Sequence, residues 1–209
     1  MTQHHPTPSV EHHDTAARLG LGEARWAVWA DDWDEGLELC GRHLERVGLV
    51  GGASQKVLDV GCGVGRLMVP LLREGHEVTG CEPSPWMRMR AREHLEASGF
   101  SDIADPCRWQ LVTDVPLYDT FDAVVCVAVF QHLDQADQYL TLAKVNEVLR
   151  PGGRLLLQVQ TEGESGPMSH PVDRFRLRNW LGRLGMDLLD ERGCTVYPTW
   201  TWYLIGRPA

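Results

Sequence analysis

Three glycines alternate over five positions directly after an apolar run that contains an acid. The run is V-L-D-V at residues 57–60, and the glycines are Gly61, Gly63 and Gly65. The pattern is typical of a buried strand that enters a tight loop and then a helix, because glycine permits positive φ and lets a ligand approach the backbone. Further along, Glu82 ends a second apolar segment, where an acid can accept hydrogen bonds from both hydroxyls of a ribose. The two segments predict a nucleoside-binding crevice at the carboxyl ends of parallel strands.

The glycine spacing distinguishes between classes of nucleoside. The dinucleotide fingerprint G-x-G-x-x-G requires a glycine at position 66, but the sequence has Arg66 there, and Gly65 comes one residue early. Asp59, two residues before the first glycine, is not part of that fingerprint either. The spacing therefore disfavours a nicotinamide oxidoreductase.

Three motifs resemble those of class I S-adenosylmethionine-dependent methyltransferases of the small-molecule type. They are D-V-G-C-G-V-G at 59–65, E-P-S-P-W-M at 82–87 and L-R-P-G-G-R-L at 149–155, and they occur in the order of that family. The resemblance covers residues 55–160. It implies S-adenosyl-L-methionine as cofactor and methyl transfer to an oxygen, nitrogen, sulfur or carbon of a small molecule, with specialised metabolism as one setting. The alternative is a protein that binds the same cofactor for a regulatory or non-methyl-transfer role.

The same resemblance implies which residues contact the cofactor. Asp59 would order the amine of the methionine tail, the glycine loop would approach the tail and ribose, and Glu82 would take the ribose hydroxyls. The residues at Leu111 and Val112 depart from the family, which often has an acid for the adenine amino group there, and Asp114 is the rival candidate. The implied cofactor-binding set is Asp59, Gly61, Cys62, Gly63, Glu82, Pro83, Ser84, Met87, Leu111, Val112 and Val127.

His132 is the candidate catalytic residue. It follows the strand expected at 121–127 and resembles a histidine common in small-molecule members of the family. Three roles stay open for it: a general base, an anchor of the cofactor loop, or a residue at a helix start. The N/D-P-P-Y/F motif is missing at this place, which disfavours methylation of a base or of an amide.

Three tryptophans near the N-terminus have helical spacing. Trp26, Trp29 and Trp33 lie three and four residues apart. They are candidate substrate-binding residues in a lid that closes over the acceptor, and the alternative is that they are core aromatics.

Hydrophobic periodicity and turn signals predict the elements that position these residues. The expected strands are 56–60, 77–82, 121–127, 154–160, 186–191 and 199–206, and the expected helices are 22–34, 34–47, 66–74, 85–98, 135–149 and 173–184. Residues 100–120 have no clear pattern and are left unassigned beside these six strands. The fold class expected is an α/β, Rossmann-like, doubly wound and mostly parallel seven-stranded sheet with a final antiparallel strand. The expected divisions are a flexible N-terminus at 1–21, N-terminal helices at 22–54 and the methyltransferase domain at 55–209.

Composition limits the partners. The net charge of −9 disfavours a nucleic-acid partner, which needs a positive surface. The sequence has no run of about eighteen apolar residues and no basic segment followed by an apolar one, so we expect a cytoplasmic protein without a membrane partner. The cysteines lack C-x-x-C spacing and favour buried thiols over disulfides or metal ligands; no metal site is expected. They are Cys40, Cys62, Cys81, Cys107, Cys126 and Cys194.

Overall fold

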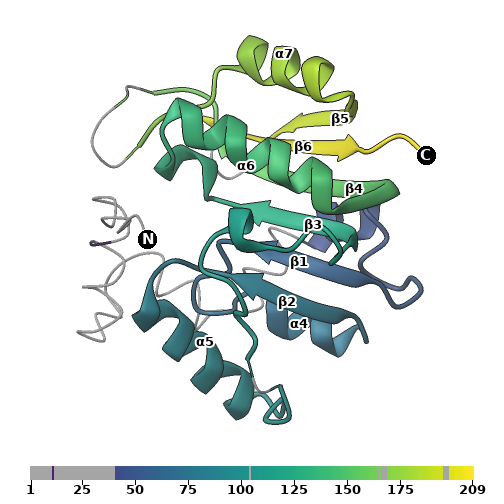
Figure 1. Cartoon of the computed structure of the whole chain (residues 1–209), viewed down its shortest axis with the longest axis vertical. Coiled ribbons are helices and arrows are strands. Elements are labelled where there is room, and N and C mark those ends of the chain that lie inside the picture. The colour runs from purple at the N-terminus through teal and green to yellow at the C-terminus, as the bar shows by residue number, and fades with distance from the viewer. Residues whose placement is uncertain (1–10, 12–40, 104, 164, 166–168, 195–197) are drawn as a thin grey trace.

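A mixed sheet of six strands forms the centre of the described chain (Figure 1). The computed structural model describes residue 11 and residues 41–209, apart from 104, 164, 166–168 and 195–197. The strands are β1 (Lys56–Val60), β2 (Glu77–Cys81), β3 (Phe121–Val127), β4 (Leu149–Gln160), β5 (Asp187–Gly193) and β6 (Trp200–Gly206). The helices are α4 (Met68–Arg73), α5 (Pro85–Ala97), α6 (Gln135–Val148) and α7 (Arg174–Leu184), with short 3₁₀ turns η1 (Val112–Asp114) and η2 (Phe130–His132).

The strand order confirms the doubly wound topology. The order across the sheet is β2-β1-β3-β4-β6-β5, in which β2, β1, β3 and β4 are parallel and β6 is antiparallel to its two neighbours. From β1 the chain moves first to one side of the sheet, to β2, and then to the other, to β3. The carboxyl end of β1 is therefore the switch point at which such sheets bind ligands.

The sheet has six strands among the described residues, where seven were expected. The segment at 106–109 runs beside β2, but it pairs in a single parallel bridge between Cys81 and Trp109. The amide of Gly80 donates to the Pro106 carbonyl at 2.7 Å, and that of Glu82 donates to the Trp109 carbonyl at 3.1 Å. Pro106 has no amide hydrogen to donate, which limits a ladder at this edge.

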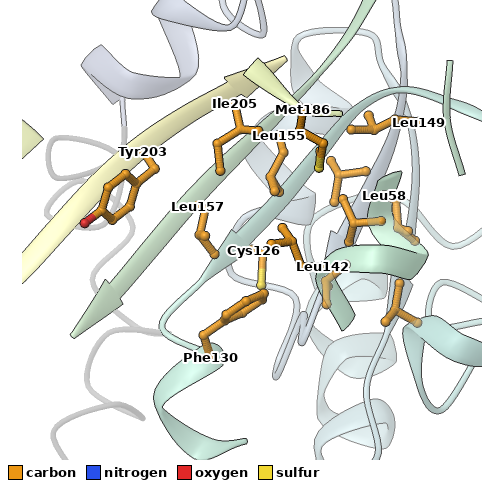
Figure 2. Packing of buried hydrophobic residues seen from close by; sticks show 14 of the residues in the cluster. Leu58, Cys126, Phe130, Leu142, Leu149, Leu155, Leu157, Met186, Tyr203 and Ile205 are labelled. Atoms are coloured by element: carbon orange, nitrogen blue, oxygen red, sulfur yellow. The ribbon is translucent and has the colours of Figure 1, made fainter. Parts of the chain in front are cut away.

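Apolar side chains fill both faces of the sheet, as expected for parallel strands covered by helices on both sides. One core cluster lies between the sheet and the helices α6 and α7, and Figure 2 shows labelled members of it, including Phe130, Cys126 and Tyr203. The other lies against α4, α5 and the segment at 41–49. In Figure 1, α6 lies in front of the sheet and α4 behind it.

Local signals set most of the helix ends. The Ser84 hydroxyl accepts from the Met87 amide at the start of α5, and the Asp134 carboxylate accepts from two amides at the start of α6. Gly185 ends α7 with φ of 66°. Residues 41–46 are helical, which agrees with the described part of the helix expected at 34–47. The remaining predictions at the N-terminus, including the three tryptophans, lie outside the described residues.

Strand β4 begins earlier than the sequence predicted. It starts at Leu149 and not at Arg154, because Pro151 forces Arg150 into extended backbone. The register to β3 shifts between Phe121 and Ala123 to accommodate this turn.

No helix within the described residues is long and apolar enough to cross a membrane.

Candidate functional site

The glycine loop after β1 lies in contact with the loop after β3. Gly61 and Gly63 have left-handed φ values of 69° and 56°. The amides of Gly61 and Cys62 both donate to the Cys81 carbonyl, at 2.8 and 3.2 Å, which joins the ends of β1 and β2. A Cβ atom at position 61 would lie 2.4 Å from Val129 Cγ2. Only glycine therefore combines this backbone conformation with this close approach.

Glu82 links the loops that follow β1 and β2. Its carboxylate is buried, with Oε2 accepting from the Gly63 amide at 3.0 Å and Oε1 from the Ser84 amide at 2.9 Å. A carboxylate can accept about four hydrogen bonds, so these backbone contacts are compatible with hydroxyl donors on the same group. One acidic side chain thus fixes two loops at the carboxyl edge of the sheet.

Arg88 was missed by the sequence analysis, although it lies in the first turn of the helix that Ser84 caps. Its Nη1 donates to the carbonyls of Glu82 and Pro83, at 2.5 and 3.0 Å. Ser84 and Met87, both members of the expected cofactor-binding set, are buried beside it. The guanidinium holds the backbone that carries these expected contacts.

Asp59 lies in β1 between Gly80 and Val125 and is 3% exposed. Burial raises the pKa of its carboxyl to about 7; Arg66 opposes the shift and Glu82 adds to it. The carboxyl is therefore partly protonated near neutral pH, and a cation placed beside it would favour the ionised form.

The raised pKa of Asp59 predicts a pH-dependent stability. An unfolded aspartate loses its proton near pH 4 and the folded Asp59 near pH 7. Between these values the folded state binds more protons than the unfolded state, so stability falls as the pH rises through this window. Urea unfolding at pH 5 and pH 8 measures this effect. Between the two pH values, the free energy of unfolding of the wild type should fall by up to about 3 kcal/mol more than that of Asp59→Asn. Equal losses in the two proteins would contradict the shift.

Leu111 and Val112 lie where the edge segment beside β2 turns into η1. The Val112 side chain is buried in the core on the α6 face, which leaves its backbone as the group available to a ligand. The carboxylate of Asp114, the rival candidate for adenine recognition, accepts from the Leu111 amide at 2.9 Å. Asp114 therefore stabilises the local turn.

The chain turns sharply after Val127, the last residue of β3. Ala128 has φ of 59°, a conformation uncommon for a residue other than glycine. The Gln131 side-chain amide donates to the Ala128 carbonyl at 2.7 Å and stabilises this turn. His132 ends η2, its amide donates to the Val129 carbonyl at 2.8 Å, and its side chain is partly exposed. Since Val129 packs on Gly61, His132 belongs to a loop that borders the glycine loop.

A second segment, which sequence reasoning missed, docks on η2. The His170 amide donates to the Gln131 carbonyl at 2.6 Å. The side-chain amide of Gln138 donates to the carbonyls of Phe130, Leu133 and His170. The two contacts made by His170 join parts of the chain far apart in sequence, and no local pattern could have indicated them.

Trp200 and Trp202 of β6 pack in the core cluster that lies against α4, α5 and the segment at 41–49. The five described cysteines are buried free thiols. Within the described part of the chain, no group of three His, Cys, Asp or Glu side chains is arranged to hold a metal ion.

The fold is Rossmann-like, and the glycine loop and the Glu82 carboxylate meet at the switch point of its sheet. Residues 57–153 match the family described as "Methyltransferase domain". The chain is 31% identical over 147 residues to an uncharacterized methyltransferase of Geobacillus kaustophilus, covering 70% of this chain and 64% of that protein. It is 29% identical over 177 residues to a ubiquinone biosynthesis O-methyltransferase of Roseobacter denitrificans, covering 73% of this chain and 68% of that protein.

A solved structure shows the same fold. The magnesium protoporphyrin IX methyltransferase of Synechocystis PCC 6803, crystallised with bound SAH, superposes with a TM-score of 0.69 at 17% identity, over 93% of this chain and 99% of that one. Residues 57–153 therefore carry a methyltransferase domain, and the chain has the fold of this magnesium protoporphyrin IX methyltransferase. The buried acid Asp59, the bare backbone at Gly63 and the carboxylate of Glu82 fit the amine, the tail and the ribose of S-adenosylmethionine.

Proposed function

We propose that this protein transfers the methyl group of S-adenosylmethionine to an oxygen, nitrogen, sulfur or carbon of a small molecule. The observation that carries the proposal is the Glu82 carboxylate, which joins the amides of Gly63 and Ser84 at the carboxyl ends of β1 and β2. An acid held in this position suits a ribose diol. The family match and the small-molecule relatives described above support the same activity.

When bound, the cofactor supplies a methyl group already activated by a sulfonium. The chain's own residues then need mainly to align the acceptor and to remove a proton from it, since positioning supplies much of the rate in such reactions. Gly61, Cys62 and Gly63 would contact the tail and ribose. Leu111 and Val112 would contact the adenine, and Val127 would lie below the donor.

His132 is proposed as the base that takes the acceptor's proton. It lies on the loop that packs against the glycine loop through Val129, and its side chain is partly exposed. A histidine can exchange protons near neutral pH. The anchor and helix-start roles remain alternatives that the variants in the Discussion separate.

The N-terminal segment with Trp26, Trp29 and Trp33 is proposed as a lid over the acceptor. The support comes from the described residues that follow this segment. The His43 ring stacks on Trp202 with centroids 4.2 Å apart, and Trp202 pairs with Gln158 of β4, which in turn pairs with Val127. His43 therefore packs near the proposed donor site.

Hydrogen exchange tests the lid. Residues 22–34 should exchange more slowly when S-adenosylhomocysteine is bound than when it is absent, because a lid orders as the site fills. As an internal control, exchange in β3 should not depend on the ligand. Strong and equal protection of residues 22–34 in both states would show that the tryptophans are core residues.

Methyl transfer itself tests the function. The protein would be incubated with S-adenosylmethionine carrying an isotopically labelled methyl group and a panel of phenols, catechols, amines, thiols and carboxylic acids, including products of specialised metabolism. The account predicts a labelled product with at least one class and release of one S-adenosylhomocysteine for each product molecule. Tight cofactor binding with no transfer to any class would favour the alternative regulatory or non-methyl-transfer role.

The proposal includes a cytoplasmic location without a membrane or nucleic-acid partner. The five described cysteines are free thiols, as is usual in a reducing compartment. The net charge of −9 is unsuited to binding nucleic acid.

A further inference from the structure

Two thiols meet directly beside the glycine loop. The Sγ atoms of Cys62 and Cys107 are 3.1 Å apart, and the two side chains are 5% and 4% exposed. Cys62 lies between the two left-handed glycines of the loop, and Cys107 lies in the edge segment beside β2. The contact therefore connects the proposed cofactor loop to the edge of the sheet.

The backbone of β2 explains why these thiols can touch. A Cβ atom at Gly80 would lie 2.6 Å from the sulfur of Cys62, so only a glycine in β2 leaves room for this side chain. The Gly80 amide also donates to the Pro106 carbonyl at 2.7 Å, which fixes the residue before Cys107. The two sulfurs are thus held together by rigid backbone on both sides.

Cys107 is buried but borders a cavity. The cavity has a volume of about 240 Å³ and lies on the side of α5 that carries Arg88, Met89 and Arg92. A cavity of this size admits molecules much larger than hydrogen peroxide. Cys81 and Cys126 pack in the other core cluster, and Cys194 contacts the side-chain amide of Gln158. Among the described cysteines, Cys62 and Cys107 are the pair in thiol–thiol contact.

We propose that hydrogen peroxide converts Cys62 and Cys107 into a reversible disulfide, and that this disulfide lowers the affinity of the glycine loop for the cofactor. The Cys107 thiol loses its proton, the thiolate attacks one peroxide oxygen and the O–O bond breaks. The leaving hydroxide takes up that proton, so a sulfenic acid and water form. The Cys62 sulfur then attacks the sulfenic sulfur, its proton leaves with the hydroxyl as water, and the S–S bond closes. Two thiols are oxidised, one peroxide is reduced, and two waters are released.

Closing the disulfide changes the position of a loop side chain. An S–S bond is about 2.05 Å long, so the two sulfurs move roughly 1 Å closer together. The Cys62 amide donates to the Cys81 carbonyl at 3.2 Å, and the neighbouring Gly63 amide donates to the Glu82 carboxylate at 3.0 Å, so the moving side chain belongs to the segment that makes both contacts. This step rests on the proposed function, because it takes these amides as part of the cofactor site.

The environment of Cys62 predicts how the second step depends on pH. The hydrogen bond to Cys107, together with burial, raises the pKa of the Cys62 thiol well above its usual range. Its thiolate, the attacking form, is scarce at neutral pH. The disulfide should therefore form faster as the pH rises.

The test treats the full chain with hydrogen peroxide and maps disulfides by mass spectrometry under non-reducing conditions. Calorimetry measures S-adenosylhomocysteine affinity before oxidation, after it, and after a dithiol reductant. We expect a Cys62–Cys107 cross-link, an affinity loss on the order of tenfold to a hundredfold, and recovery on reduction. Cys107→Ser should bind the ligand normally and be insensitive to peroxide, and Cys107→Ala serves if serine impairs folding. Cys194→Ser, the matched buried cysteine, should behave as the wild type.

Three results would overturn the proposal. The first is oxidation without a Cys62–Cys107 cross-link. The second is a cross-link that leaves the affinity unchanged, and the third is a peroxide-induced loss of affinity that persists in Cys107→Ser. If the reduced wild type does not bind S-adenosylhomocysteine, the proposed function fails, while the mapped cross-link still tests the chemistry of the thiol pair.

Discussion

Replacing Glu82 with alanine should weaken binding of S-adenosylhomocysteine by roughly 10²–10⁴-fold, because two hydrogen bonds to a charged group are lost at about 1.5–3 kcal/mol each. The variant also leaves the amides of Gly63 and Ser84 without their acceptor, so the two loops lose the group that joins them. Calorimetric titration of the wild type and the variant measures the loss. An affinity that barely changes would contradict the ribose assignment.

Two further variants separate the effects of charge and of position. In Glu82→Gln the side chain keeps one oxygen, so it can accept from only one of the two amides and presents its own N–H₂ to the other. Its affinity should therefore lie nearer to that of the alanine variant than to that of the wild type. Glu74→Gln is the matched control, because Glu74 also accepts a backbone amide, from Gly51 at 2.9 Å, but is exposed at the end of α4. It should bind as the wild type does, and nicotinamide dinucleotides should bind negligibly to all four proteins.

Replacing His132 with alanine should lower methyl-transfer turnover by roughly 10²–10⁴-fold, the usual contribution of a general base, with cofactor affinity intact. The reason is its place on the loop after β3, next to the glycine loop. Turnover and S-adenosylhomocysteine affinity are measured on the same preparation. If the affinity falls and turnover does not, His132 anchors the cofactor loop. If neither changes, His132 is only a residue at a helix start.

The neighbouring residues provide controls for this experiment. His132→Gln can still form hydrogen bonds but cannot act as a base near neutral pH, so it should be as slow as the alanine variant. His170→Ala tests the other imidazole near η2, whose backbone contacts Gln131, and should leave turnover unchanged. A chelator should also leave turnover unchanged. Loss of turnover when a chelator is added would contradict a metal-free reaction.

Local signals account for what the sequence predicted correctly. Ser84 and Asp134 cap helices with their own side chains, and Gly61 and Gly63 have the left-handed backbone that their spacing indicated. Glu82 directly follows β2, as its place after an apolar segment predicted, while its contact with a ribose stays a prediction. In each case the contacts that set the local structure are made to residues nearby in the sequence, or within a loop that follows one of two adjacent strands.

Contacts between distant segments account for most of what was missed. The edge segment at 106–109 depends on the backbone of β2, and its proline prevents a regular ladder, so the seventh strand is not formed among the described residues. The positive φ of Ala128 has no local signal, because alanine rarely adopts it. The docking of His170 on η2 and the contact of Cys62 with Cys107 join residues far apart in sequence.

The most direct test of the central claim is a crystal structure of the full chain with S-adenosylhomocysteine. We expect both ribose hydroxyls to lie within hydrogen-bond distance of the Glu82 carboxylate, the tail to lie over Gly61–Gly63, and the sulfur to face the loop at 128–132. A ligand bound elsewhere, for example in the cavity beside α5, or one that does not contact Glu82, would contradict it.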